Sequence, residues 1–234
     1  MRSRLVLAAI ALAAAASAAA PVPAQPRKGA PARADWTRTV VATPEGGFRM
    51  GNPAAKVKVV EYGSLTCPHC AEFAGASKGP LTAHVRSGKV SFEFRNYVLN
   101  APDVAASLLA RCGGAGRFFP LVERFYAQQP QWLAKVHGLT DAQNAEIEKL
   151  PLERMMPRLA AVAGLVPISA GAGLTPQQAR ACLASRPAID RLVRLAEAAG
   201  AQGVDSTPTF FVNGARVHAH EWAELAPIIR RAGG

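Results

Sequence analysis

The chain has 234 residues, a length that allows one domain with an elaboration or two small domains. Half of its residues are hydrophobic and only 18% are charged, which excludes an intrinsically disordered protein and favours a compact globular one. The formal net charge is +11, but the basic residues are spread along the chain rather than gathered in a run. This distribution argues against a nucleic-acid partner and favours acidic or unfolded proteins as partners.

Residues 1–24 have the composition of a secretory signal peptide. Arg2 and Arg4 supply a positive start, and an apolar stretch and small residues follow. The apolar stretch is shorter than the ~20 residues that a membrane-spanning helix needs, so we predict cleavage and a soluble mature protein. Residues 25–36 are rich in Pro, Ala and Arg and are predicted to form a flexible lead-in.

Residues 37–100 are predicted to form the first part of an α/β core. Residues 57–62 are a β-branched run typical of a strand, and Pro68 begins a helical pattern that continues towards Val85. Residues 90–98 alternate apolar and polar side chains, which predicts a strand with one buried face.

Residues 101–185 are predicted to form an all-helical block, because Ala, Leu, Arg and Gln dominate and β-branched clusters are few. Within this block, Thr140 and Thr175 are each followed three residues later by Gln, the capping-box pattern of a helix start. Pro176 strengthens the second start, since proline is favoured at the first helical position.

Residues 186–234 are predicted to complete the core. An amphipathic helix comes first, then a strand over 209–212, which the hairpin signal Asn213-Gly214 joins to a short second strand, and a final helix over 221–231. This order of elements predicts an α/β fold in which one core sheet is interrupted by an inserted all-helical domain.

Cys67, Pro68, His69 and Cys70 form a Cys-Pro-His-Cys motif at the predicted junction of strand and helix. The unpaired N–H groups and the dipole at a helix N-terminus favour an anion, so the pKa of Cys67 should lie well below that of a free thiol. Cys67 would then serve as nucleophile and leaving group, and the more enclosed Cys70 would resolve mixed disulfides. The His69 side chain is expected to stabilise the thiolate further, by a hydrogen bond or a positive charge.

Two other uses of this motif stay open at this point. Two cysteines separated by two residues form half of a zinc site, although Cys112 and Cys182 are single and far apart in sequence. The pair is alternatively a structural disulfide, although a bridge across two residues is strained and gains little loop entropy.

Two segments carry a resemblance to a known family. Residues 61–70, Glu-Tyr-Gly-Ser-Leu-Thr-Cys-Pro-His-Cys, and residues 206–214, Ser-Thr-Pro-Thr-Phe-Phe-Val-Asn-Gly, resemble the DsbA-like thioredoxin family of bacterial disulfide oxidoreductases, in its alphaproteobacterial type. The resemblance extends over about residues 40–231, including the position of the helical insertion. It implies a thioredoxin-like core sheet and a thiol:disulfide oxidoreductase that uses neither a cofactor nor a metal.

The resemblance also implies roles for residues outside the motif. Pro208, preceded by Thr207, corresponds to a cis-proline that faces the active-site sulfurs, where backbone groups pair with an extended substrate strand. Glu61 corresponds to a buried acid that accepts the proton of the resolving cysteine. Cys112 and Cys182 resemble a second cysteine pair and would form a structural disulfide. The residues alone leave a trans proline, a solvated glutamate and two buried free thiols open.

We therefore expect a monomeric periplasmic oxidase that introduces disulfides into unfolded or reduced exported proteins and is reoxidised by a membrane redox partner. An isomerase or reductase on the same fold is the alternative. Isomerases usually hold their clients through an oligomerising segment, and residues 25–45 lack the heptads for one. A metal-binding or chaperone module without redox turnover is a third possibility.

Overall fold

A computed structural model describes residues 35–234 of the protein. The predicted signal peptide and almost all of the predicted lead-in lie outside the described residues. No helix in this part combines the length and the apolar character that crossing a bilayer requires.

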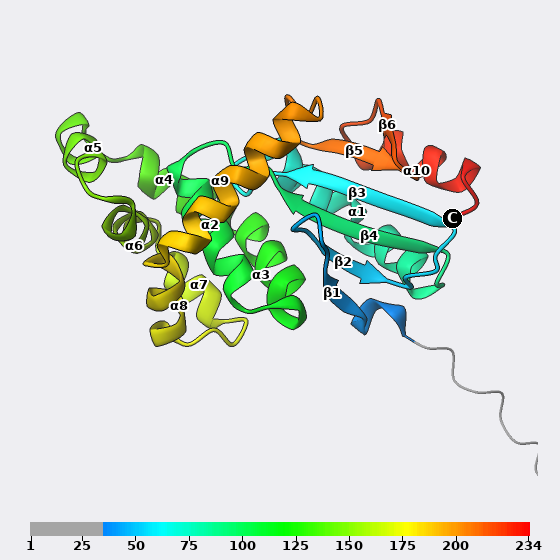
Figure 1. The fold of residues 1–234 in the computed structure, drawn as a ribbon, viewed down its shortest axis with the longest axis horizontal. Coiled ribbons are helices and arrows are strands. Elements are labelled where there is room, and N and C mark those ends of the chain that lie inside the picture. The colour runs from blue at the N-terminus through cyan, green and yellow to red at the C-terminus, as the bar shows by residue number, and fades with distance from the viewer. Residues whose placement is uncertain (1–34) are drawn as a thin grey trace, which may run out of the picture. The chain divides into compact units, whose positions relative to one another are not determined.

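A six-stranded mixed sheet with the strand order β1-β2-β4-β3-β5-β6 forms the core (Figure 1). Its strands are β1 (Val40–Ala42), β2 (Phe48–Gly51), β3 (Val57–Gly63), β4 (Val90–Asn96), β5 (Thr209–Val212) and β6 (Ala215–Val217). β3 and β4 are parallel and the other neighbours are antiparallel. The crossover between β3 and β4 is α1 (Pro68–Arg86), and a short 3-10 helix (Trp36–Arg38) precedes β1.

A helical insertion follows β4 and separates the two halves of the sheet in sequence (Figure 1). Its helices are α2 (Ala101–Cys112), α3 (Ala115–Ala127), α4 (Gln129–His137), α5 (Asp141–Glu148), α6 (Leu152–Ala163), α7 (Leu165–Ala170) and α8 (Pro176–Leu183). α9 (Arg186–Ala201) leads back to β5, and α10 (Trp222–Arg231) ends the chain. The predicted architecture, an α/β fold whose core sheet is interrupted by an inserted helical region, is confirmed.

The helix-start and hairpin motifs predicted from the sequence are present in the structure. Thr140 and Thr175 each complete a capping box with the Gln three residues later, and so begin α5 and α8. Asn213 and Gly214 have φ values of 51° and 85°, as the tight hairpin between β5 and β6 requires.

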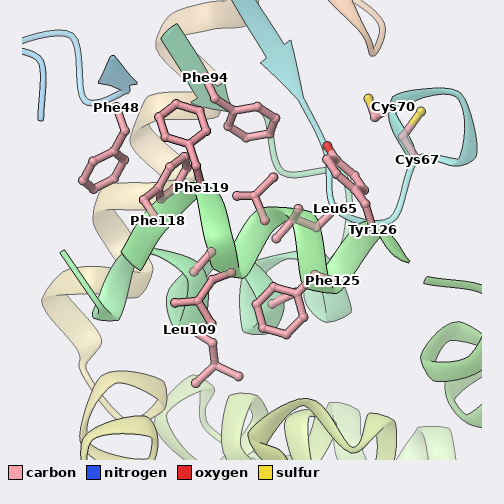
Figure 2. Packing of buried hydrophobic residues seen from close by; sticks show 14 of the residues in the cluster. Phe48, Leu65, Cys67, Cys70, Phe94, Leu109, Phe118, Phe119, Phe125 and Tyr126 are labelled. Atoms are coloured by element: carbon pink, nitrogen blue, oxygen red, sulfur yellow. The ribbon is translucent and has the colours of Figure 1, made fainter. Parts of the chain in front are cut away.

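Aromatic side chains fill the contact between the sheet and the helical insertion (Figure 2). The ring of Phe118 in α3 stacks on Phe48 of β2 with centroids 4.1 Å apart, and it lies 5.8 Å from Phe94 of β4. The neighbouring Phe119 contacts Phe92 of β4 at 5.9 Å. α3 is therefore anchored directly on the sheet, and the hydrophobic area it buries holds the insertion in place.

β4 differs from the prediction, which gave it one buried face. Ser91 and Glu93 are 2% and 7% exposed, so the polar positions of the strand are covered as well. The cover includes the turn between β1 and β2, where the Thr43 hydroxyl donates to the Glu93 carboxylate at 2.7 Å. The prediction was wrong because it did not include the turn between β1 and β2, which lies against the Glu93 side chain.

Candidate active site

The Cys-Pro-His-Cys motif lies at the N-terminus of α1, directly after β3 and the loop of residues 64–66. Cys67 is the N-cap residue of α1, and Cys70 lies in its first turn. Both are free thiols in the structure, with Cys67 7% exposed and Cys70 fully buried. Pro68 occupies the first helical position, where the missing N–H costs nothing. The more accessible sulfur is thus the one at the helix end.

The surroundings of Cys67 favour its thiolate. Its pKa falls from the ordinary value of 9.0 to about 5, chiefly because the Cys70 thiol donates a hydrogen bond to it. The Thr207 side chain and the backbone N–H groups of Cys70 and His69 lower this pKa as well, while burial opposes them. The backbone N–H groups at the helix N-terminus thus lower the pKa of Cys67, as the sequence predicts, but the Cys70 thiol lowers it more.

The His69 side chain is paired with Glu72 of the same helix, and stabilisation of the Cys67 thiolate by its imidazole stays a prediction. Its Nδ1 lies 3.2 Å from the Glu72 carboxylate, and both side chains are exposed. His69 lowers the pKa of Cys67 through its backbone N–H. The main chain at the helix end thus supplies part of the stabilisation of the Cys67 thiolate.

Cys70 and Glu61 are buried behind Cys67. Burial, the Cys67 sulfur and the Glu61 carboxylate raise the pKa of Cys70 well above its ordinary value. Glu61 lies on β3 and is 2% exposed, and burial followed by the charge of Cys67 raises its pKa from 4.5 to about 8. Its Oε1 has no hydrogen-bond partner within residues 35–234. At neutral pH, Glu61 is therefore a protonated acid beside a buried thiol.

Thr207 and Pro208 lie opposite the dithiol, immediately before β5. The peptide bond between them is cis. The Sγ of Cys67 lies 3.3 Å from the carbonyl oxygen of Thr207. The structure thus brings Thr207 to Cys67 across 140 positions of sequence, beside the dithiol and Glu61.

Cys112 and Cys182 are joined to each other by a disulfide that links the end of α2 to α8. Cys112 is the last residue of α2, whereas the first turn of that helix contacts the active-site loop. The bridge therefore belongs to the interior of the insertion and not to the dithiol site. In the part of the chain that the structure describes, no group of three or more His, Cys, Asp or Glu is placed to hold a metal ion.

Three polar residues of the insertion, which we did not predict, bond to the loop before Cys67. They are Asp103 of α2, Tyr126 of α3 and Gln129 of α4. Asp103 is fully buried, and burial raises its pKa from 3.8 to about 6 although several hydrogen bonds oppose the rise. The only local signal is the helix start at Asn100, whose side chain caps α2 by accepting from the Asp103 N–H.

Comparison with known proteins places this geometry in a family. A family model described as thioredoxin matches residues 43–231. The chain belongs to the thioredoxin family. This thioredoxin-family protein is similar to a crystal structure of a protein-disulfide isomerase from Novosphingobium aromaticivorans, with a TM-score of 0.76 and 31% identity over 80% of this chain and 98% of that one. The alpha-DsbA1 structure from Wolbachia pipientis shares the fold, with a TM-score of 0.59 and 20% identity over 79% and 89% of the two chains.

Curated relatives of this thioredoxin-family protein carry a provisional name, protein-disulfide oxidoreductase. One from Rickettsia bellii is 27% identical over 191 residues, or 80% of this chain. Another from Rickettsia typhi is 26% identical over 186 residues, or 78% of this chain. The matches span 65% and 60% of the lengths of these two relatives. The thioredoxin-like part of the resemblance that residues 61–70 and 206–214 carry is confirmed by the family match over residues 43–231.

Proposed function

We propose that the protein is a periplasmic thiol:disulfide oxidoreductase that introduces disulfides into exported proteins. The observation that carries this proposal is the contrast between two sulfurs in one helical turn. Cys67 has a pKa of about 5, whereas that of Cys70 lies well above 9.0. A thiol that ionises so easily is a good leaving group, so a disulfide that contains it passes readily to a client.

The proposed reaction begins from the Cys67–Cys70 disulfide. A client thiolate attacks the sulfur of Cys67, the Cys67–Cys70 bond breaks, and Cys70 leaves as a thiolate that takes the proton of Glu61. A second client thiolate then attacks the client sulfur of the mixed disulfide, and Cys67 leaves as a thiolate. The client loses two electrons and the protein gains them. The Cys70 thiol then donates to the Cys67 thiolate, which stabilises the reduced product.

Disulfide isomerisation is the second candidate, because the similar structure from Novosphingobium aromaticivorans is named a protein-disulfide isomerase. An isomerase works from the reduced state: its Cys67 thiolate attacks a wrong disulfide in the client and is later released when the client forms a new one. The two activities use the same sulfurs, and differ in the redox state from which the protein starts.

The proposed location and partners follow from the sequence and the second cysteine pair. Residues 1–24 have signal-peptide composition, and a disulfide such as Cys112–Cys182 persists in oxidising compartments. Unfolded or reduced exported proteins would be the clients of a monomeric enzyme, and a membrane redox partner would reoxidise it. Cell fractionation of the full chain, probed for the periplasmic pool, tests the location.

Refolding of ribonuclease tests the activity. We expect the oxidised protein to accelerate recovery of activity from reduced ribonuclease. Recovery from scrambled ribonuclease by the reduced protein would instead favour the isomerase. Cys67→Ser should abolish either activity, and replacement of both Cys112 and Cys182 by serine serves as a control that leaves the dithiol intact and no unpaired thiol behind. If neither substrate responds, a metal analysis and a thiol count with and without reductant will test the binding-module alternative.

A further inference from the structure

The loop that leads to Cys67 is held by the helical insertion. Gln129, the first residue of α4, is 3% exposed and directs its amide towards the main chain of this loop. Its Nε2 donates to the carbonyl oxygen of Leu65 and to that of Cys67, both at 2.9 Å. One buried amide therefore joins the residue that carries the nucleophilic sulfur to the residue two positions before it.

Two further residues of the insertion hold the same loop. The Tyr126 hydroxyl donates to the carbonyl oxygen of Ser64 at 3.1 Å, and Figure 2 shows this side chain reaching towards the segment that carries the two cysteines. The Asp103 carboxylate accepts from the Leu65 N–H at 3.0 Å and from the Ser64 hydroxyl at 2.5 Å. The insertion thus supplies hydrogen-bond donors to carbonyl groups of the loop and an acceptor to its N–H and hydroxyl groups.

Gln129 differs from the other two because it contacts Cys67 itself. The Cys67 carbonyl also accepts the first hydrogen bond of α1, from the Ala71 N–H at 3.3 Å. The amide of Gln129 therefore acts on the peptide unit at which the loop becomes a helix. The N–H groups of His69 and Cys70, which stabilise the Cys67 thiolate, belong to the helical turn that the bond from Ala71 to this carbonyl closes.

We propose that Gln129 is a positioning residue for the dithiol, which holds the carbonyl groups of Leu65 and Cys67 so that the helix N-terminus stabilises the Cys67 thiolate. The inference rests on the proposed function, in which Cys67 is the nucleophile. It assigns the helical insertion a part in setting the reactivity of the sulfur.

Gln129→Met in the full chain is the test, because methionine keeps the length and removes the donor. Trp132→Phe is the matched control, since Trp132 lies in the same helix and its buried Nε1 donates to the Phe125 carbonyl of α3 at 2.9 Å, so the change deletes a hydrogen bond that does not end on the loop. The measurements are the pH titration of the Cys67 thiolate by ultraviolet absorbance, the equilibrium of the dithiol with glutathione, and the stability in denaturant.

Both variants should lower stability, but only Gln129→Met should raise the pKa of Cys67. We expect it to lower the equilibrium constant for reduction of the Cys67–Cys70 disulfide by glutathione about 3- to 10-fold, the net effect of one hydrogen bond. If Gln129→Met does not fold, Gln129→Asn, whose amide is one methylene shorter, should give a smaller change in the same direction.

An unchanged titration and equilibrium in a folded Gln129 variant would overturn the inference, as would an equal change in Trp132→Phe. Failure of the proposed function would look different. In that case the wild-type protein itself would titrate like a free thiol and would not exchange with reduced ribonuclease.

Discussion

The acidity of Cys67 predicts how the stability of the reduced protein varies with pH. Its pKa falls from 9.0 to about 5 on folding, and a lowered pKa contributes stability that is complete above the unfolded value and disappears as the pH falls through the folded value. Each pKa unit is worth ~1.4 kcal/mol, so the full contribution is about 5 kcal/mol above pH 9, and about 3 kcal/mol of it is present at pH 7. Cys67→Ser should remove it.

The contribution of Glu61 to stability has the opposite pH dependence and must be distinguished from that of Cys67. Its pKa rises from 4.5 to about 8 on folding, so its contribution is complete below pH 4.5 and is lost as the pH rises towards 8. Burial is the larger cause of this shift and is common to the wild type and the serine variant. The difference in stability between the two proteins therefore reports chiefly on Cys67, together with the smaller part of the Glu61 shift that the Cys67 charge causes.

Urea unfolding of both proteins between about pH 5 and pH 8 measures this difference, with a glutathione buffer keeping Cys67 and Cys70 reduced and Cys112–Cys182 intact. The free energy of unfolding of the wild type should exceed that of Cys67→Ser by an amount that grows by ~1.4 kcal/mol per pH unit. A difference that stays constant with pH would refute the reasoning, because it would mean that the Cys67 sulfur titrates alike in the folded and unfolded chains.

Three more variants test other charges and bonds of the site. Glu61→Gln should flatten the decline in melting temperature of the oxidised protein as the pH rises above about 4.5, since burial, the larger cause of the raised pKa of Glu61, persists when the Cys67–Cys70 disulfide forms; an unchanged decline would exclude Glu61 as its source. Asp103→Asn should likewise flatten the loss of stability that denaturant titrations show as the pH rises from about 4 to 6, because it removes a buried acid with a raised pKa. At pH 4 it should also destabilise the protein by ~1–3 kcal/mol, because the amide that replaces the carboxyl group can face the N–H donor of Leu65 with its own N–H groups. Replacing both Cys112 and Cys182 by serine should lower the free energy of unfolding by up to about 4 kcal/mol, since their disulfide closes a loop with a sequence separation of 70, and should leave the Cys67 titration unchanged; a shifted titration would connect the two cysteine pairs.

The parts of the fold that could be predicted are those with strong local signals. The capping boxes at Thr140 and Thr175 depend on residues three apart, and the hairpin at Asn213 depends on one dipeptide. The helix that begins at Pro68 has its start signal and its dithiol in one turn. In each case the residues that cause the element to form lie within a few positions of it, so the element can be predicted from a single sequence.

The parts that could not be predicted depend on contacts between distant segments. β1 and β2 are short strands whose pairing with each other and with β4 decides their existence, and neither has a long alternating pattern. Gln129 reaches the main chain of Cys67 across 62 positions of sequence. Nothing in the residues around Gln129 distinguishes it from the exposed glutamines of the same helical block.

Cys67 and Glu61 together explain why reduction should strengthen the fold increasingly as the pH rises. In the folded reduced protein near pH 7, the proton resides on Glu61 and the charge on Cys67; in the unfolded chain the thiol holds the proton and the carboxylate the charge. The two states bind equal numbers of protons at these two sites, so the opposing pH dependences cancel in the reduced protein. Of these two groups only Glu61 titrates in the oxidised protein, and its contribution to stability falls as the pH rises. The gap between the reduced and oxidised proteins therefore widens with pH, and with it the tendency of the Cys67–Cys70 disulfide to pass to a client.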